Sequence, residues 1–393
     1  MGKFSKRLIA AALSALMALS VAACGSSSSG ASGSAAASGS AGSGSASASN
    51  EQVKLKFSSM NPDSDNKYAV VMKAWFNYIK QQTNGNITFD EYYSSTAAEA
   101  ADQLTAASTG IVDIGEVFSA YWGDSFPLWE LFMLPFQYSF PDGYTFSHAT
   151  VAMMEKYPEF IQEVEDQNVH FLMLHGDGVG QLFTKSKEIK SAADLKGLVI
   201  NCGSNTDVEL MTLLGASTEM MGAMEVYDNV SKGVLDGYCQ CYTGSYVTGA
   251  IDAASYATEI DGAHQGWFFV MNNDTYNSLP EDYKQYFDEP STKDFMYLLG
   301  YQFAQDELQT VNKISQNAKI TVYKPTDAEK QTFIDASKPM AQEWIDKVTK
   351  QGFDGQSMYN DWVKLLAEYG TPDYSGCKDR LTELGATVPD GWQ

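Results

Sequence analysis

The sequence predicts an α/β protein built as two lobes, and three observations support that class. Short apolar stretches typical of strands alternate with amphipathic helix patterns from residue 53 onward, which is the order of elements in a parallel α/β sheet. The alternation begins again near residue 170, after an aromatic-rich loop. The segment from Glu51 to Gln393 is about 340 residues long, which is enough for two domains with separate cores.

The first lobe is expected to open with a strand, because Val53-Lys54-Leu55-Lys56-Phe57 alternates with period two. The helix that follows has one apolar face and ends at Thr83-Asn84-Gly85, with the glycine that a helix C-terminus prefers. Strand, helix, strand, helix, strand predicts a parallel sheet. The five expected elements are strands over 53–57, 87–89 and 111–114 and helices over 68–82 and 97–108.

The strand pattern restarts over 170–174 and continues with strands expected over 198–200 and 234–242. In sheets of this kind, ligands bind beyond the carboxyl ends of the strands. Polar residues that follow these strands are therefore the first candidates for a binding site.

The pattern of residues 1–23 predicts an N-terminal export signal. It has a basic start without acidic residues, then an apolar stretch over 8–23 that is too short for a spanning helix. Small residues, Val21-Ala22-Ala23, precede Cys24, and this arrangement resembles the bacterial lipobox, in which the cysteine is lipidated. The alternative is an ordinary signal peptide with a chance cysteine.

Residues 24–50 read as the lipidated Cys24 and a flexible tether of Ser, Gly and Ala without a charge. Such a segment cannot bury enough apolar surface to fold, and as a coil it reaches roughly 25–30 Å. We therefore expect an extracytoplasmic protein that is anchored by lipid in the periplasm or on the outer face of the cytoplasmic membrane.

Composition excludes some partners. The chain carries 49 acidic and 26 basic residues, a net charge of −23, which argues against nucleic acid and against binding anionic head groups by charge. Aromatic residues make up 12% of the chain, which suits ligand sites that stack on small molecules.

The cysteines beyond Cys24 leave two possibilities open: buried free thiols, or one disulfide from Cys202 to Cys239 or Cys241. None of the four histidines stands at a metal-ligand spacing from these cysteines, so we expect no metal site and no cofactor. The residues concerned are Cys202, Cys239, Cys241, Cys377, His148, His170, His175 and His264.

Eight short stretches, in order, resemble the solute-binding proteins of TRAP-type transporters, the dicarboxylate-binding DctP-like class. Each is weak alone, and their order along the chain makes the resemblance specific. The stretches are Thr83-Asn84-Gly85-Asn86-Ile87, 108–114, Leu134-Pro135-Phe136, 193–198, Leu214-Gly215-Ala216, Glu225-Val226-Tyr227, 232–237 and Leu279-Pro280-Glu281.

The resemblance implies a periplasmic-binding-protein-like fold with a long helix, within 292–315, that spans both lobes. It implies lobe 1 over 51–177 and 266–305, and lobe 2 over 178–265 and 306–393. It also implies a monomer that captures a small polar molecule and delivers it to a membrane permease driven by an ion gradient. An ABC-type solute-binding lipoprotein and a ligand-sensing lipoprotein are the alternatives.

At several positions where the family usually has ligand-binding residues, this sequence has different ones. Asn201 stands where the family usually has an arginine that grips a carboxylate, and Gly180 stands in place of a second basic residue. Ala223 falls where a proline–aromatic pair is usual, while Gln240 replaces an asparagine. The resemblance thus implies that an amide remains while the cations and an aromatic wall are absent.

A carboxylate buried without a cation costs several kcal/mol, so dicarboxylates and sialic-acid-like ligands are disfavoured. Small residues at Gly180 and Ala223 would enlarge the pocket. A neutral sugar- or polyol-like ligand fits this inventory best, and a cation is the alternative if carboxylates point inward. The candidate hydrogen-bonding and stacking residues are Asn201, Gln240, Tyr93, Tyr121, Trp122, Glu116 and Asp177.

Structural explanations compete for several of these residues. Trp122 could belong to the core, and Glu116 and Asp177 could be solvated acids of an acidic protein.

An enzyme is not expected: the glycines at 176, 178 and 180 lack the rest of a dinucleotide fingerprint, and no nucleophile elbow or phosphate loop is present.

Overall fold

The computed structural model describes residues 52–63, 69–137, 142–288, 291–316 and 319–393. The predicted export signal, Cys24 and the tether fall outside the described residues, so these predictions stay open. In the described part of the chain, no helix combines the length and the apolar character that crossing a membrane requires.

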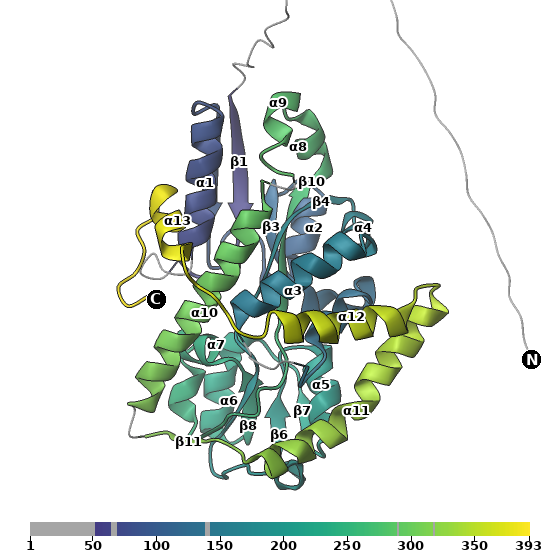
Figure 1. The fold of residues 1–393 in the computed structure, drawn as a ribbon. Coiled ribbons are helices and arrows are strands. Elements are labelled where there is room, and N and C mark those ends of the chain that lie inside the picture. The colour runs from purple at the N-terminus through teal and green to yellow at the C-terminus, as the bar shows by residue number, and fades with distance from the viewer. Residues whose placement is uncertain (1–51, 64–68, 138–141, 289–290, 317–318) are drawn as a thin grey trace, which may run out of the picture. The chain divides into compact units, whose positions relative to one another are not determined.

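The first lobe is built on a five-stranded sheet with the order β2-β1-β3-β10-β4 (Figure 1). Strand β1 pairs in parallel with β2 and β3, whereas β10 runs antiparallel to both of its neighbours. The three strands for which a parallel arrangement was predicted are parallel, and the whole sheet is mixed because β10 enters from the second lobe in the opposite direction. The strands are β1 (Val53–Ser58), β2 (Ile87–Tyr92), β3 (Ile114–Phe118), β4 (Val169–Gly176) and β10 (Gly266–Asn272).

Helices cover this sheet, and most of the predicted elements are present. The strand predicted over 111–114 begins only at Ile114, because the backbone N–H groups of Ile111 and Val112 bond to the Ala106 carbonyl at the end of α2. Ile111 is 59% exposed as a result. The helices of this lobe are α1 (Val70–Gln82), α2 (Gln103–Ser108), α3 (Gly143–Lys156), α4 (Glu159–Glu165), α8 (Asn273–Ser278) and α9 (Glu281–Lys284).

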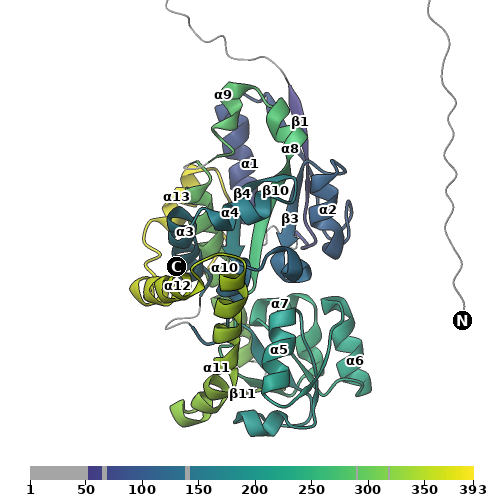
Figure 2. The same cartoon turned by 90° about the vertical axis from the view of Figure 1, so that its right-hand side faces the viewer.

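The second lobe is built on a six-stranded sheet with the order β11-β9-β5-β8-β6-β7. Figure 2 shows this lobe with its helices α5, α6 and α7 and the edge strand β11. Strand β8 is shorter than the predicted 234–242, because Cys241 already caps the next helix. The elements are β5 (Gln181–Thr184), β6 (Val199–Asn201), β7 (Ser217–Glu219), β8 (Gly237–Gln240), β9 (Tyr256–Thr258) and β11 (Thr321–Tyr323), with helices α5 (Asn205–Leu213), α6 (Val226–Lys232) and α7 (Tyr242–Val247).

One long helix connects the two lobes. Helix α10 (Lys293–Ser315) packs against α1, α3 and β4 of the first lobe and against α7 of the second. Figure 1 shows it running from one lobe to the other. This confirms the predicted two-lobed α/β fold with a spanning helix.

The C-terminal helices pack on both lobes. Helix α11 (Asp327–Lys350) contacts α5, whereas α12 (Gly355–Glu368) contacts α3 and α13 (Cys377–Glu383) contacts α10. The lobe boundaries remain a prediction, and this packing favours moving α12 and α13 from lobe 2 to lobe 1.

Candidate functional site

The carboxyl ends of strands from both sheets meet between the lobes. Strand β4 ends at Gly176 and β8 at Gln240. The residues that directly follow these strands approach each other, with the Cys241 Sγ 4.0 Å from the Asp177 Oδ2. We call the polar residues gathered here the interlobe seam; they are Asp177, Asp207, Gln265, Trp267 and Glu307.

Gln265 links two carboxylates of the seam. Its backbone N–H donates to Asp177 Oδ1 at 3.2 Å, and its side-chain Nε2 donates to Asp207 Oδ2 at 3.1 Å. The Trp267 indole N–H adds a contact of 3.4 Å to Asp177 Oδ2. Because Asp177 directly follows β4 and Asp207 lies in α5, this arrangement joins the first lobe to the second.

Burial makes ionisation of the seam carboxylates unfavourable. It raises the pKa of Asp177 to about 8, and the nearby charges of Glu307 and Asp207 push in the same direction. Burial also raises the pKa of Asp207 to about 6 and the pKa of Glu307 above its usual value. In the part of the chain that the structure describes, no lysine or arginine is among the groups that shift these three pKa values.

Arginine is nearly absent from the protein. The whole sequence contains Arg7, within the predicted export signal, and Arg380. Arg380 lies on α13, where its Nε is 2.8 Å from Asp294 and its Nη1 3.5 Å from Glu383. No arginine of the described residues therefore reaches the seam to grip a carboxylate in a bidentate pair.

Asn201 ends β6 and is 4% exposed. Its side-chain oxygen accepts a hydrogen bond from the Met221 N–H at 3.1 Å, which ties down the loop that leads to Ala223. Ala223 is half-buried and opens the short helix η6 (Ala223–Glu225). A role of either residue in binding stays a prediction.

Gln240 ends β8, and its Oε1 is buried without a hydrogen-bond partner among the described residues. Gln265 Oε1 is in the same situation. A buried amide oxygen without a donor is costly, so both positions are suited to a ligand that donates a hydrogen bond.

Packing explains why residue 180 is a glycine. A Cβ built on it would lie 3.0 Å from the Cys239 Sγ, so this thiol already occupies the space that we expected to enlarge a pocket. The four cysteines of the described residues are free and buried, which decides between the two possibilities that the sequence left open.

Glu116 is not a solvated acid, because it is 2% exposed in the middle of β3. It accepts hydrogen bonds from Ser59 Oγ and from Asn61 Nδ2 (3.2 Å), and its Oε1 lies 3.2 Å from His175 Nε2. Burial lowers the pKa of His175 despite this carboxylate.

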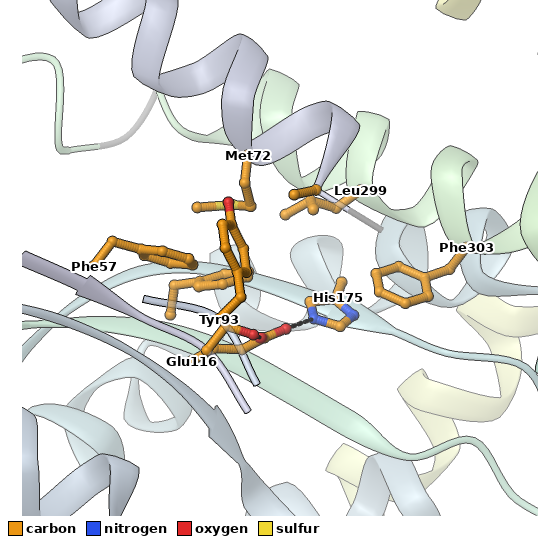
Figure 3. A pocket seen from close by; sticks show the side chains of 10 residues that line it. Phe57, Met72, Tyr93, Glu116, His175, Leu299 and Phe303 are labelled. Carbon is orange, nitrogen blue, oxygen red and sulfur yellow. Dashed lines mark hydrogen bonds and ion pairs between the residues drawn. The ribbon is translucent and has the colours of Figure 1, made fainter. Parts of the chain in front are cut away.

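The Glu116–His175 pair lines a small cavity in the first lobe (Figure 3). Tyr93 lines the same cavity, and its hydroxyl donates to Glu91 at 2.8 Å. Met72 and Leu299 reach in from α1 and α10. Tyr93 and Glu116, two sequence-predicted residues, are thus brought together here rather than at the seam.

The cavity and the seam are neighbours on one face of the first sheet. His175 pairs across the strands with Trp267, and their rings stack with centroids 5.7 Å apart. Trp267 also pairs with Phe118, and these rings stack at 4.5 Å. Trp267 therefore contacts both His175, which pairs with Glu116 in the cavity, and Asp177 at the seam.

Tyr121 and Trp122 lie in the short helix η3 (Ser119–Ser125), which follows β3 and packs against α5 of the second lobe. Tyr121 is 37% exposed and sits edge-on to Phe118 at 4.9 Å. Trp122 is half-buried against the main core, and its indole N–H has no hydrogen-bond partner in the described residues. Trp122 thus combines core packing with an unused donor.

Four residues of the seam were not predicted from the sequence as site residues: Asp207, Gln265, Trp267 and Glu307. Gln265 directly precedes the buried strand β10, and Trp267 is its second residue, so the apolar run of this strand was the available signal. Within the described ranges, no group of three or more His, Cys, Asp or Glu side chains converges as a metal site would require.

Comparisons with known proteins agree with this architecture. The sequence model of the bacterial extracellular solute-binding protein family 7 matches residues 57–347. A solute-binding protein of Chromohalobacter salexigens is 21% identical over 180 residues, 45% of this chain and 52% of that protein. The C4-dicarboxylate-binding periplasmic protein DctP of Rhodobacter capsulatus is 23% identical over 255 residues, 64% of this chain and 74% of that protein. The chain spans about half the length of the first two curated relatives it matches.

Solved structures have the same fold. A TRAP solute-binding protein of Rhodoferax ferrireducens with copurified benzoate superposes with a TM-score of 0.73 at 25% identity, covering 81% of this chain and 98% of that one. A Bordetella bronchiseptica protein with bound mandelate has a TM-score of 0.73 at 24% identity, covering 80% and 99%. A Chromohalobacter salexigens protein with bound D-glucuronate has a TM-score of 0.68 at 16% identity, covering 79% and 99%. The Bordetella and Chromohalobacter structures are less than 25% identical to this chain, so they show a likeness in fold alone.

Proposed function

Because the chain belongs to the bacterial extracellular solute-binding protein family 7, we propose that it captures a small polar molecule between its lobes and hands it to a TRAP-type permease. The observation that carries this proposal is the likeness to a solved TRAP solute-binding protein over nearly the full length of that protein. The seam supplies what capture needs, since residues of both lobes and of α10 meet there. Binding and release, without chemical change of the ligand, is the proposed activity.

We place the protein outside the cytoplasm. The family is extracellular by its description, and the N-terminal residues read as an export signal. Attachment by lipid at Cys24 would keep the binding lobes within roughly 25–30 Å of the membrane, where the permease lies.

The ligand of this chain should lack the carboxylate that its relatives' ligands carry. Benzoate, mandelate and glucuronate are all organic acids, and each occupies a solved relative named above. At the seam of this protein an organic acid would meet the carboxylates of Asp177 and Asp207 and no arginine among the described residues. A neutral, sugar- or polyol-like molecule fits the amides of Asn201, Gln240 and Gln265.

The test has two parts. Protein purified from its own producing cells is denatured, and the released small molecules are identified by mass spectrometry; we expect one dominant compound without a carboxylate. Uptake of that compound by cells should require the TRAP membrane subunits and persist when ATP is depleted under a maintained ion gradient. Uptake that depends on ATP alone would instead indicate an ABC-type permease.

Closure around the ligand is the second measurement. X-ray scattering of the same protein should give a smaller radius of gyration with ligand than without it, because two lobes joined by α10 close on what they bind. Equal radii at saturating ligand would contradict capture between the lobes.

A further inference from the structure

We infer that the ligand is a small organic ammonium ion, whose charged nitrogen lies between the carboxylates of Asp177 and Asp207. This rests on the proposed function and narrows it, choosing a cation over the neutral ligand that the sequence favoured. The two carboxylates are held by the same residue, Gln265, and come from opposite lobes, so a cation between them would draw the lobes together.

Charge balance is the first argument. Two other carboxyls are near Asp177, since the charges of Glu307 and Asp207 both act on it. Buried charges in proteins are normally paired, because an unpaired one loses several kcal/mol of hydration. No lysine or arginine of the described residues offsets the burial that raises the pKa values of these three carboxyls, and a positive ligand would favour their charged forms.

Unused acceptors are a second, independent argument. Gln240 Oε1 and Gln265 Oε1 are both buried and lack a donor in the described parts of the chain. An ammonium group carries up to three N–H donors and no acceptor, so it can donate to the two carboxylates and to the Gln265 Oε1 that lies on the same side chain as their bridge. An organic acid would leave these oxygens unpaired and add repulsion.

The surroundings suit an organic cation rather than a metal ion. No group of three metal-binding side chains converges within the described ranges. Phe118, Tyr121 and Trp267 form an aromatic cluster beside Asp177, and Tyr121 is its exposed ring. Aromatic rings attract ammonium ions through their electron-rich faces, and they also contact the apolar part of such ligands. Trp267 acts as a positioning residue, because its N–H holds the Asp177 carboxylate.

The experiment compares ligands that differ only in charge. Calorimetric titration uses three matched sets: benzylamine, benzyl alcohol and benzoate; ethanolamine, ethylene glycol and glycolate; putrescine, 1,4-butanediol and succinate. We expect at least one amine to bind at least about tenfold more tightly than its matched alcohol, because hydrogen bonds to charged groups contribute about 1.5–3 kcal/mol. The acids should show no binding.

Two variants test whether the amines bind at the seam. Asp207→Asn keeps the shape of the side chain and should weaken amine binding at least about tenfold, since one charged partner is lost. Asp252→Asn, on an exposed aspartate of the second lobe, makes the same charge change and should leave binding unaltered. Far-ultraviolet circular dichroism checks that both variants are folded.

The outcomes separate the two proposals. Equal binding of an amine and its alcohol, or no binding of any amine, overturns the ammonium inference. Binding of the acids overturns it as well, while solute capture would stand. Failure of the proposed function itself would show as uptake without dependence on the TRAP subunits, whichever compound binds.

Discussion

Glu307 of α10 holds the first turn of α7 through Thr243. Its carboxylate accepts hydrogen bonds from the Thr243 N–H at 2.8 Å and from the Thr243 hydroxyl at 2.6 Å, and from the Tyr242 N–H at 2.9 Å. A Cβ on Gly178 would lie 2.4 Å from the Glu307 carboxyl carbon, so glycine there leaves room for this contact. The helix that spans the lobes is thereby fixed to the second one.

Removing that contact should loosen the second lobe. We expect Glu307→Ala to lower the free energy of unfolding by about 2–4 kcal/mol, because three hydrogen bonds to a charged acceptor are lost. Glu307→Gln keeps one acceptor oxygen and should cost about half as much. Urea unfolding followed by tryptophan fluorescence measures both. Equal stability of Glu307→Ala and the parent protein would show that the contact contributes nothing.

Stability without ligand should fall as the pH rises from 6.5 to 8.5. The pKa of Asp177 is raised to about 8, so the folded protein holds a proton there that the unfolded chain has already lost, and this advantage disappears as the pH passes 8. Glu163, whose pKa burial raises to about 7, acts in the same direction. The pKa values of His148 and His264 are lowered to about 4, so these rings are neutral throughout this range.

Thermal unfolding at both pH values measures this effect. Asp177→Asn should reduce the difference between the two melting temperatures, because the variant has no proton to lose. Asp177 is half-buried as a residue, so solvent moderates the size of the effect. A melting temperature that rises with pH in the parent protein would contradict the assignment.

Gly180 and Cys239 should behave as a coupled pair. Gly180→Ala alone should cost about 1–3 kcal/mol, because the new methyl group meets the Cys239 thiol. In a Cys239→Ala background the same substitution should cost much less, since the sulfur is gone. A double-mutant cycle of urea unfolding gives the coupling energy. Additive effects would mean that the thiol is not what requires glycine.

Asn201 should affect ligand affinity through its amide. Asn201→Ala should weaken binding of the ligand released from the native protein about tenfold, because a hydrogen bond of about 0.5–1.5 kcal/mol is lost and its partner is left unpaired. Asn201→Asp retains an acceptor for the Met221 N–H and so separates loop anchoring from ligand contact. Calorimetric titration of both variants decides. Unchanged affinity in Asn201→Ala would place this residue outside the binding site.

Cys24 should anchor the protein. Cys24→Ala should move the protein from the membrane fraction to the soluble extracytoplasmic fraction and leave ligand affinity unchanged, because the tether carries no part of the seam. Intact-mass measurement of membrane-extracted parent protein should show a lipid-modified N-terminus at Cys24. An unmodified N-terminus at or beyond this residue would exclude the lipoprotein.

Local patterns in the sequence were enough for the class of fold. The alternation at Val53–Ser58, the apolar face of Val70–Gln82 and the glycine turn after it each depend on a few neighbouring residues, and all three occur as expected. Periodicity and capping are properties of a short segment, so the sequence by itself determined these three elements. The long helix Lys293–Ser315 was instead expected within 292–315 from the resemblance to the solute-binding family.

Contacts between distant segments decided the rest. The antiparallel insertion of β10, the Cys239 thiol beside Gly180, and the burial of Glu116 all depend on residues far away along the chain. The seam likewise joins Asp177, Asp207, Gln265 and Glu307, which no local pattern connects. Whether an acid is solvated or buried without a base depends on what surrounds it in space, and only the tertiary structure sets those surroundings.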